Sequence, residues 1–169
     1  MALLKFNRCV QINSPVTQSD FSTPAKSAIV TSGGNCSGHM LKVKDTLRAT
    51  VHLTYDGRVM KAYHGPKAHE RFTNEVRVLR YLEECGCNFV PRLLEADEAN
   101  LRIITTNCGS RVERIDEPRA RELFAELEKF GVRHDDADPR NITYRFSDGR
   151  FCLIDFEFAT ILPDHPKSK

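Results

Sequence analysis

The alternation of hydrophobic and polar positions predicts a small sheet where the ordered part of the chain begins. Residues 50–55 alternate β-branched or apolar side chains with polar ones, and residues 58–63 return as a second strand. Between them, residues 56–57 form an Asp-Gly pair, which is a strong signal for a two-residue hairpin turn. We expect a further strand at residues 41–44, and a break at the His-Gly-Pro segment 64–66.

A helical period follows this predicted hairpin. Phe72, Val76, Leu79 and Leu82 are separated by four, three and three residues, which places them on one face of a helix. The pattern predicts a helix over residues 67–84, and the Cys-Gly pair directly after it should end the helix.

A second helix is predicted over residues 117–130. It has a proline in its first turn, where the missing amide costs little, and a glycine directly after it. Its apolar stripe consists of Ala120, Leu123, Phe124, Leu127 and Phe130.

Short apolar runs predict the remaining strands. Residues 89–94 and 101–106 flank a polar turn, and residues 141–146 and 150–154 flank a Ser-Asp-Gly turn. Strands and helices therefore occur in an order that predicts an α+β fold with a mostly antiparallel sheet.

The first forty residues differ from the rest of the chain. Residues 1–40 are rich in Ser and Thr, contain scattered Pro and Gly, and hold no period, so we predict a disordered tail followed by one domain over residues 41–169. The glycine-rich segment 33–38 has two interpretations, a phosphate-binding loop or a flexible linker. We favour the linker, because no convincing strand precedes the glycines.

Composition narrows the class of protein. Hydrophobic residues make up 40% of the chain and charged residues 28%, which is ordinary for a soluble protein. The net charge of +2 comes from the tail, so basic and acidic groups balance over residues 41–169, and we expect no nucleic-acid partner. No apolar run is long enough for a membrane span and no signal peptide is evident, so we expect a cytoplasmic protein without a membrane span. The six cysteines form no paired metal motif and are expected to be free thiols rather than a zinc site.

The most informative positions are three oxygen-bearing side chains late in the sequence. Asp136 and Asn141 lie five residues apart in a polar loop after the second predicted helix, and Asp155 directly follows an apolar strand. A charge at the end of a buried strand is costly unless a metal or a partner compensates it. The predicted hairpin between Asn141 and Asp155 should fold these two residues toward each other, and their oxygens suit a magnesium ion. Asp136 is then available to accept a proton from a hydroxyl group.

Lys61 and Glu75 form a second candidate pair. Lys61 lies inside an apolar strand, and Glu75 lies beside the apolar stripe of the first helix. A lysine held by a helix glutamate can remain charged and fixed beside the phosphates of a nucleotide. Taken singly, Lys61 could instead face outward from a half-buried strand, and Glu75 could lie on a solvated helix face.

The five positions together resemble the protein-kinase-like superfamily over residues 41–160. The matching motifs are Val59-Met-Lys61, Asn74-Glu75, His134-Asp-Asp136 with Asn141 five residues later, and Leu153-Ile-Asp155-Phe-Glu157. In style they are most similar to aminoglycoside phosphotransferases, lipopolysaccharide kinases, and the small Rio-type and KEOPS-subunit kinases. The resemblance implies an antiparallel N-lobe sheet with one helix, plus a minimal, truncated C-lobe.

The resemblance also implies an activity, an ATP- and Mg²⁺-dependent kinase that moves the γ-phosphate to a hydroxyl of a protein or small molecule. In such an enzyme Lys61, held by Glu75, would bind phosphates and Asp136 would act as the base. Asn141 and Asp155 would hold magnesium. His134 would orient the loop. Residues 106–109 fall where the hinge that receives adenine would be, which makes Thr106 and Cys108 cofactor-binding candidates.

Three departures keep an alternative open. The turn near residues 44–49 has no glycine, so that Lys44 or Arg48 would have to compensate, and Asp138 stands where many protein kinases carry a lysine. The sequence ends fourteen residues after Asp155, without the usual activation segment and substrate-binding helices. The alternative is a pseudokinase-like module that binds nucleotide or serves as a scaffold without turnover. A partner chain that completes the C-lobe is a further expectation.

Overall fold

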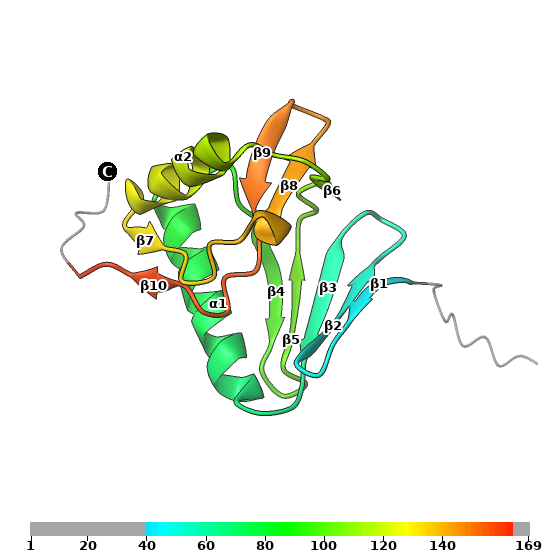
Figure 1. The fold of residues 1–169 in the computed structure, drawn as a ribbon. Coiled ribbons are helices and arrows are strands. Elements are labelled where there is room, and N and C mark those ends of the chain that lie inside the picture. Colours follow the sequence, from blue (N-terminus) through cyan, green and yellow to red (C-terminus); the bar gives the residue numbers. More distant parts are fainter. Residues whose placement is uncertain (1–39, 164–169) are drawn as a thin grey trace, which may run out of the picture. The chain divides into compact units, whose positions relative to one another are not determined.

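The predicted hairpin lies inside a five-stranded antiparallel sheet (Figure 1). The computed structural model describes residues 40–163, and the sheet has the order β1-β2-β3-β5-β4. Its strands are β1 (Leu41–Asp45), β2 (Ala49–Leu53), β3 (Val59–Tyr63), β4 (Leu93–Asp97) and β5 (Arg102–Thr105). The predicted tail of residues 1–40, with its glycine-rich segment 33–38, lies outside the described residues except for Met40.

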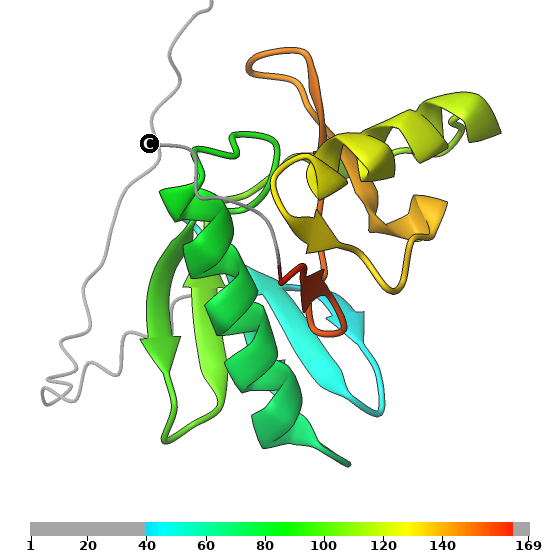
Figure 2. The same ribbon diagram turned by 90° about the vertical axis from the view of Figure 1, so that its left-hand side faces the viewer.

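Helix α1 (Ala68–Glu84) lies across one face of this sheet (Figure 2). The predicted apolar stripe is buried as expected, because the spacing of three and four residues turns every member toward the sheet. Leu79 and Leu82 are fully buried, and they belong to the same core cluster as Tyr63 of β3 and Ile103 of β5.

The remaining elements form a second group that shares this core. They are β6 (Ser110–Arg111), α2 (Glu117–Glu128), β7 (Val132–Arg133), the 3-10 helix η1 (Pro139–Asn141), β8 (Ile142–Arg145), β9 (Arg150–Leu153) and β10 (Thr160–Ile161). Strands β6, β8 and β9 form one small antiparallel sheet, and β7 pairs with β10. Leu127 of α2, Ile142 of β8 and Leu153 of β9 extend the core that α1 covers.

The structure corrects one predicted strand. Residues 89–94 do not form it, and β4 begins only at Leu93. Pro91 has no amide hydrogen for a sheet ladder, and the carbonyl of Phe89 accepts a hydrogen bond from the amide of Leu153 at 2.9 Å. Phe89 and Val90 are nevertheless buried, so the apolar pattern marked core residues rather than a strand.

The first strand contains an irregularity in its pairing with β2. Lys42 pairs with His52, but Lys44 pairs with Val51, because the register shifts between the two lysines. A bulge adds one residue to a strand and reverses the face onto which the following side chains project. Lys44 is therefore in register with Val51 and Lys61, on the sheet face opposite to that of Lys42.

These elements confirm the predicted α+β class, with an antiparallel five-stranded sheet and two α-helices. Among residues 40–163, the helices are too short and too polar for any of them to cross a membrane.

Two glycines with similar backbone angles give a test of how closely the chain packs between β5 and β8. Gly109 has φ +88° and a Cβ built on it would lie 2.0 Å from the carbonyl oxygen of Tyr144, whereas Gly57 has φ +76° and no atom within 4 Å. We expect Gly57→Ala to lower the free energy of unfolding by about 1 kcal/mol, because alanine is strained in the left-handed backbone conformation. Gly109→Ala should cost about 3 kcal/mol or more, because backbone must move. Urea unfolding measures both, and equal costs would contradict this close approach.

Candidate functional site

The site is centred on the ammonium group of Lys61. Alternation along β3 turns Lys61 and Tyr63 inward, and the Lys61 side chain is only 11% exposed. Its Nζ lies 2.7 Å from Oε2 of Glu75, 2.5 Å from Oδ1 of Asp155 and 3.5 Å from Oε2 of Glu157. A buried charge requires partners of this kind, and here three carboxylates supply them.

Glu75 is the most firmly held of these carboxylates. It lies on the buried face of α1, one turn from Phe72 and Leu79. The Oε2 atom of Glu75 accepts hydrogen bonds from Lys61 and, at 2.6 Å, from the hydroxyl of Tyr63. Its Oε1 atom accepts from the amide of Phe156 at 3.4 Å. The predicted pairing of Lys61 with Glu75 is therefore present, and Glu75 also connects α1 with the segment after β9.

Asp155 reaches the cluster through an unusual backbone conformation. It has φ 70°, in the left-handed region that costs a residue other than glycine about 1 kcal/mol. This conformation follows directly after β9 and brings one carboxylate oxygen to Lys61, while the other lies 3.6 Å from Nζ of Lys44. Such backbone outliers concentrate at functional sites, where the surrounding contacts enforce them.

Glu157 joins the cluster to a second buried cation. Its Oε2 lies 3.2 Å from Nη1 of Arg71, which is buried on α1 one turn before Glu75. The Arg71 guanidinium also donates to three backbone carbonyls, those of Arg48, His64 and Pro66. Arg71 thus fixes Glu157 and the loops around the end of β3 at the same time.

These contacts determine the charge states of the central groups. Burial disfavours the charged form of Lys61, but Glu75, Asp155 and Glu157 outweigh it and hold the Lys61 pKa above its usual value. Burial likewise opposes ionisation of Asp155, yet Lys61 and then Lys44 keep its pKa below 3.8. Lys61 is therefore a cation and Asp155 an anion at neutral pH.

The three carboxylates also form a compact set of oxygen atoms. One oxygen each from Glu75, Asp155 and Glu157 lies within 4.8 Å of the others. Oxygen ligands are those that hard divalent cations prefer. Glu75 is the least available of the three, since Lys61 and Tyr63 both use it.

Asp136 and Asn141 are in contact with each other in the loop before β8. The amide nitrogen of Asn141 donates to the Asp136 carbonyl at 2.8 Å and to its Oδ2 at 3.1 Å. Because these bonds use the nitrogen, the amide oxygen of Asn141 is the atom that a cation could approach. Arg140 grips both carboxylate oxygens of Asp136, at 2.8 and 2.9 Å, and its hydrogen bonds hold the Asp136 pKa below the usual value.

The β8–β9 hairpin folds the backbone of Asn141 back toward the segment that contains Asp155, as predicted. Strands β8 and β9 pair Ile142 with Leu153, and the amide of Ile154 donates to the carbonyl of Asn141 at 3.0 Å. Asn141 therefore lies opposite the residue that precedes Asp155.

His134 is buried beside the segment that follows β9. Its Nε2 lies 3.0 Å from the carbonyl oxygen of Ile154, and its ring packs between Phe124 of α2 and Phe156. These contacts tie the loop that contains Asp136 to the segment that contains Asp155.

Thr106 and Cys108, the two candidates for adenine contact, both make internal contacts. Thr106 exchanges hydrogen bonds with Arg92, its amide donating to the Arg92 carbonyl and its hydroxyl accepting from the Arg92 amide. The carbonyl of Cys108 accepts from the hydroxyl of Thr143 at 2.8 Å, and the thiol is buried against Cys152, which together with burial raises the Cys108 pKa. Among residues 40–163, neither of them forms a hydrogen bond or ion pair with Lys61 or its three carboxylates.

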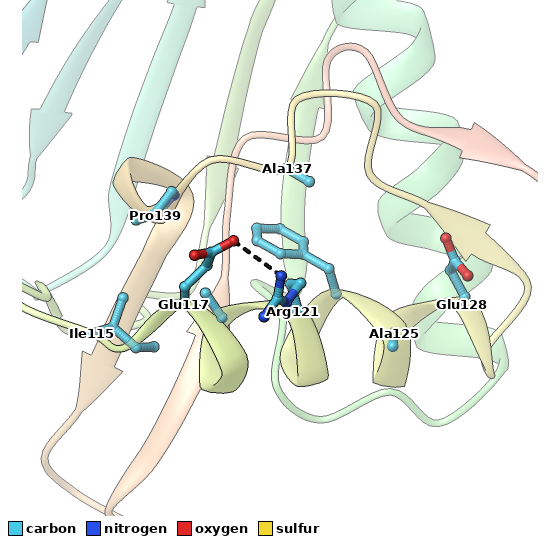
Figure 3. Close-up of a pocket in the computed structure, with 9 residues that line it drawn as sticks. Ile115, Glu117, Arg121, Ala125, Glu128, Ala137 and Pro139 are labelled. Atoms are coloured by element: carbon cyan, nitrogen blue, oxygen red, sulfur yellow. Dashed lines mark hydrogen bonds and ion pairs between the residues drawn. The ribbon is translucent and has the colours of Figure 1, made fainter.

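A separate groove of about 410 Å³ borders α2 (Figure 3). Glu117 and Arg121, joined by an ion pair at 3.0 Å, lie on one side, and Ala137 and Pro139 lie on the other. Ala137 and Pro139 belong to the loop of Asp136, but Lys61 and its three carboxylates do not line this groove.

Several residues that build the site had no predicted role. Arg71 and Tyr63 are the clearest, and a signal for Arg71 exists in the sequence. Arg71 and Glu75 are charged residues one turn apart on the predicted apolar face of α1, where an unpaired charge would be costly. The contact of Glu157 with Arg71 could not be predicted, because it joins residues 86 positions apart.

No protein-family model and no curated protein matches this chain. The interpretation of the site therefore rests on its own geometry.

Replacing Lys61 tests how much the cluster contributes to stability. Lys61→Met leaves buried carboxylates without their central cation, and we expect a loss of about 3–5 kcal/mol in the free energy of unfolding at pH 7. The matched control is Lys42→Met, whose side chain is 54% exposed on the other face of the sheet and should change stability by less than about 0.5 kcal/mol.

The pH dependence of this loss adds a second measurement. Because the folded pKa of Asp155 is depressed, the stabilisation by its pair with Lys61 is complete above the usual carboxyl pKa of 3.8. It is lost as the pH falls through the lower folded pKa. The difference between wild type and Lys61→Met in urea unfolding should therefore shrink at acid pH, and a difference independent of pH would contradict the charge account.

A second variant tests the Arg140 contact. Arg140→Gln removes the main interaction that depresses the Asp136 pKa, so this pKa should rise toward its usual value of 3.8. An NMR titration of the Asp136 carboxyl carbon measures the change. An unchanged pKa would show that the bidentate contact does not persist in solution.

Proposed function

We propose that the chain is an ATP- and Mg²⁺-dependent phosphotransferase of protein-kinase-like fold, acting on a hydroxyl of a protein or small molecule. The observation that carries the proposal is the buried Lys61, paired with Glu75 and touching Asp155. Phosphoryl transfer depends mainly on positioned cations and electrostatic stabilisation. This cluster provides a fixed cation, and its carboxylates would serve as metal ligands.

On the phosphate side, Lys61 would bind oxygens of the nucleotide. Glu75 keeps the lysine charged and in place, since it is itself held by Tyr63 and the Phe156 amide. A cation that is already fixed in position needs little reorganisation when an anion binds.

On the metal side, Asp155 and Asn141 would hold magnesium. Their oxygens fit a hard cation, and the β8–β9 hairpin brings their backbones together. When bound, the metal would neutralise charge on the transferred phosphoryl group.

On the acceptor side, Asp136 would orient the hydroxyl and receive its proton. The Asp136 side chain is 33% exposed. The side-chain amide of Asn141 donates to its Oδ2, which holds Asp136 beside Asn141, the proposed metal ligand. The low pKa that Arg140 imposes makes Asp136 a weak base, which suits a reaction that requires positioning more than proton abstraction.

A second candidate function is nucleotide binding or scaffolding without turnover. Two observations favour it. The amides of Arg48 and Ala49 in the β1–β2 turn donate to the hydroxyl of Thr46, so they are occupied where a kinase loop would offer amides to phosphates. Arg140 also occupies both oxygens of the proposed base, Asp136.

Nucleotide binding and transfer distinguish these functions. We expect wild type to bind a non-hydrolysable ATP analogue more tightly with Mg²⁺ than without, measured by calorimetry. Asp155→Asn should abolish the magnesium-dependent part of the affinity, a loss of at least about tenfold, or about 1.4 kcal/mol. Asp148→Asn, in the turn of the same hairpin, is the matched control and should bind as wild type does.

Transfer of labelled phosphate from ATP is then measured for wild type and Asp136→Ala. Transfer that is lost in Asp136→Ala supports the enzyme. Binding without transfer, unchanged by Asp136→Ala, supports the second candidate. Failure of wild type to bind the analogue contradicts the enzyme and any nucleotide-binding role, and leaves scaffolding alone.

A further inference from the structure

Lys44 projects toward the site because of the irregularity in β1. Lys42 and Lys44 would lie on the same face of a regular strand, but the register shift between them reverses Lys44. Lys44 pairs with Val51, which pairs with Lys61, so the three residues follow one another across the same face of the sheet. Bulges often re-aim side chains next to functional sites.

The two lysines converge on a single anion. Nζ of Lys61 lies 2.5 Å from Oδ1 of Asp155, and Nζ of Lys44 lies 3.6 Å from its Oδ2. The Asp155 carboxylate thus occupies a position between two ammonium groups, as one phosphate group of a polyphosphate could. The Lys44 side chain is 43% exposed, so it has room to follow a larger anion.

The β1–β2 turn offers few alternatives for holding an anion. Its amides at Arg48 and Ala49 are occupied by the Thr46 hydroxyl. The guanidinium of Arg48 lies over the ring of Phe158, 5.6 Å from its centre, rather than beside Asp155. Of the two residues expected to compensate for the missing glycines, Lys44 is therefore the one that reaches the cluster.

We propose that Lys44 and Lys61 form a two-lysine clamp for the phosphate chain of a nucleoside triphosphate, in which Lys44 replaces the loop amides. This inference rests on the proposed function and adds a specific phosphate-binding residue to it. A cation bound at Asp155 would weaken the hold of that carboxylate on both ammonium groups, and the phosphates would become their counter-ion. The clamp recognises charge, so its contribution is the same for any triphosphate and absent for an uncharged nucleoside.

The test compares Lys44→Gln with Lys42→Gln, which removes the same charge from the opposite face of the same strand. Calorimetry with Mg²⁺ measures the affinity for the ATP analogue, for inorganic tripolyphosphate and for adenosine. We expect Lys44→Gln to weaken the binding of both phosphate compounds by about tenfold, as expected for one charge-assisted contact. Adenosine binding should not change, Lys42→Gln should match wild type, and Lys44→Arg should retain most of the affinity.

The outcomes separate failure of the clamp from failure of the proposed function. If Lys44→Gln and Lys42→Gln bind both phosphate compounds as wild type does, the clamp is overturned while the phosphotransferase proposal stands. If Lys44→Gln weakens the ATP analogue but not tripolyphosphate, Lys44 acts on the nucleoside, and the clamp is again overturned. If wild type binds neither compound, the proposed function fails and the clamp fails with it. Urea unfolding of each variant establishes that the fold is retained.

Discussion

The rest of the structure depends on the ion pair between Lys61 and Glu75 and on the two carboxylates that close around it. Lys61 comes from the central sheet, Glu75 from α1, and Asp155 and Glu157 from the segment after β9. Isolated, each of these charges would be costly to bury, so none can be removed without leaving the others uncompensated. The cluster therefore fixes the orientation of α1 against the sheet and the path of the chain after β9.

The same interactions set a cost for binding any ligand. The Asp155 carboxylate is paired with the ammonium groups of Lys61 and Lys44. To bind at these ammonium groups, an anion has to displace the carboxylate, which then needs another cation. A metal-bound phosphate supplies an anion for the two lysines and a cation for Asp155 at the same time. A free anion leaves Asp155 without a cation, and a free cation leaves the lysines without that anion. For this reason the proposals link metal and phosphate. The contacts of Asp155 with both lysines hold its backbone in the left-handed conformation.

Much of this arrangement could be predicted from the sequence, and the limits have physical causes. The hairpin at residues 56–57, the stripe of α1 and the hairpin before Asp155 follow from local periodicity and turn chemistry, and all three form. The strand predicted at residues 89–94 was wrong, because an apolar run records burial, and Pro91 and the Leu153 contact decide the backbone pairing. Local patterns did not indicate the link between Arg71 and Glu157, the reversal of Lys44 by a bulge, or the grip of Arg140 on Asp136. The first depends on residues 86 positions apart and the second on strand register. The third joins residues only four apart, but in an irregular loop whose course no periodic pattern indicates.

The most direct measurement is a crystal structure of the chain with Mg²⁺ and a non-hydrolysable ATP analogue. The account predicts metal density on the carboxylate of Asp155 and the amide oxygen of Asn141, with phosphate oxygens at hydrogen-bonding distance, about 3 Å, from Nζ of Lys61. Glu75 should keep its contact with Lys61. A complex in which the analogue binds elsewhere, with Lys61 still closed on Asp155 and without metal there, would contradict the claim that this cluster is a site for metal-bound phosphates.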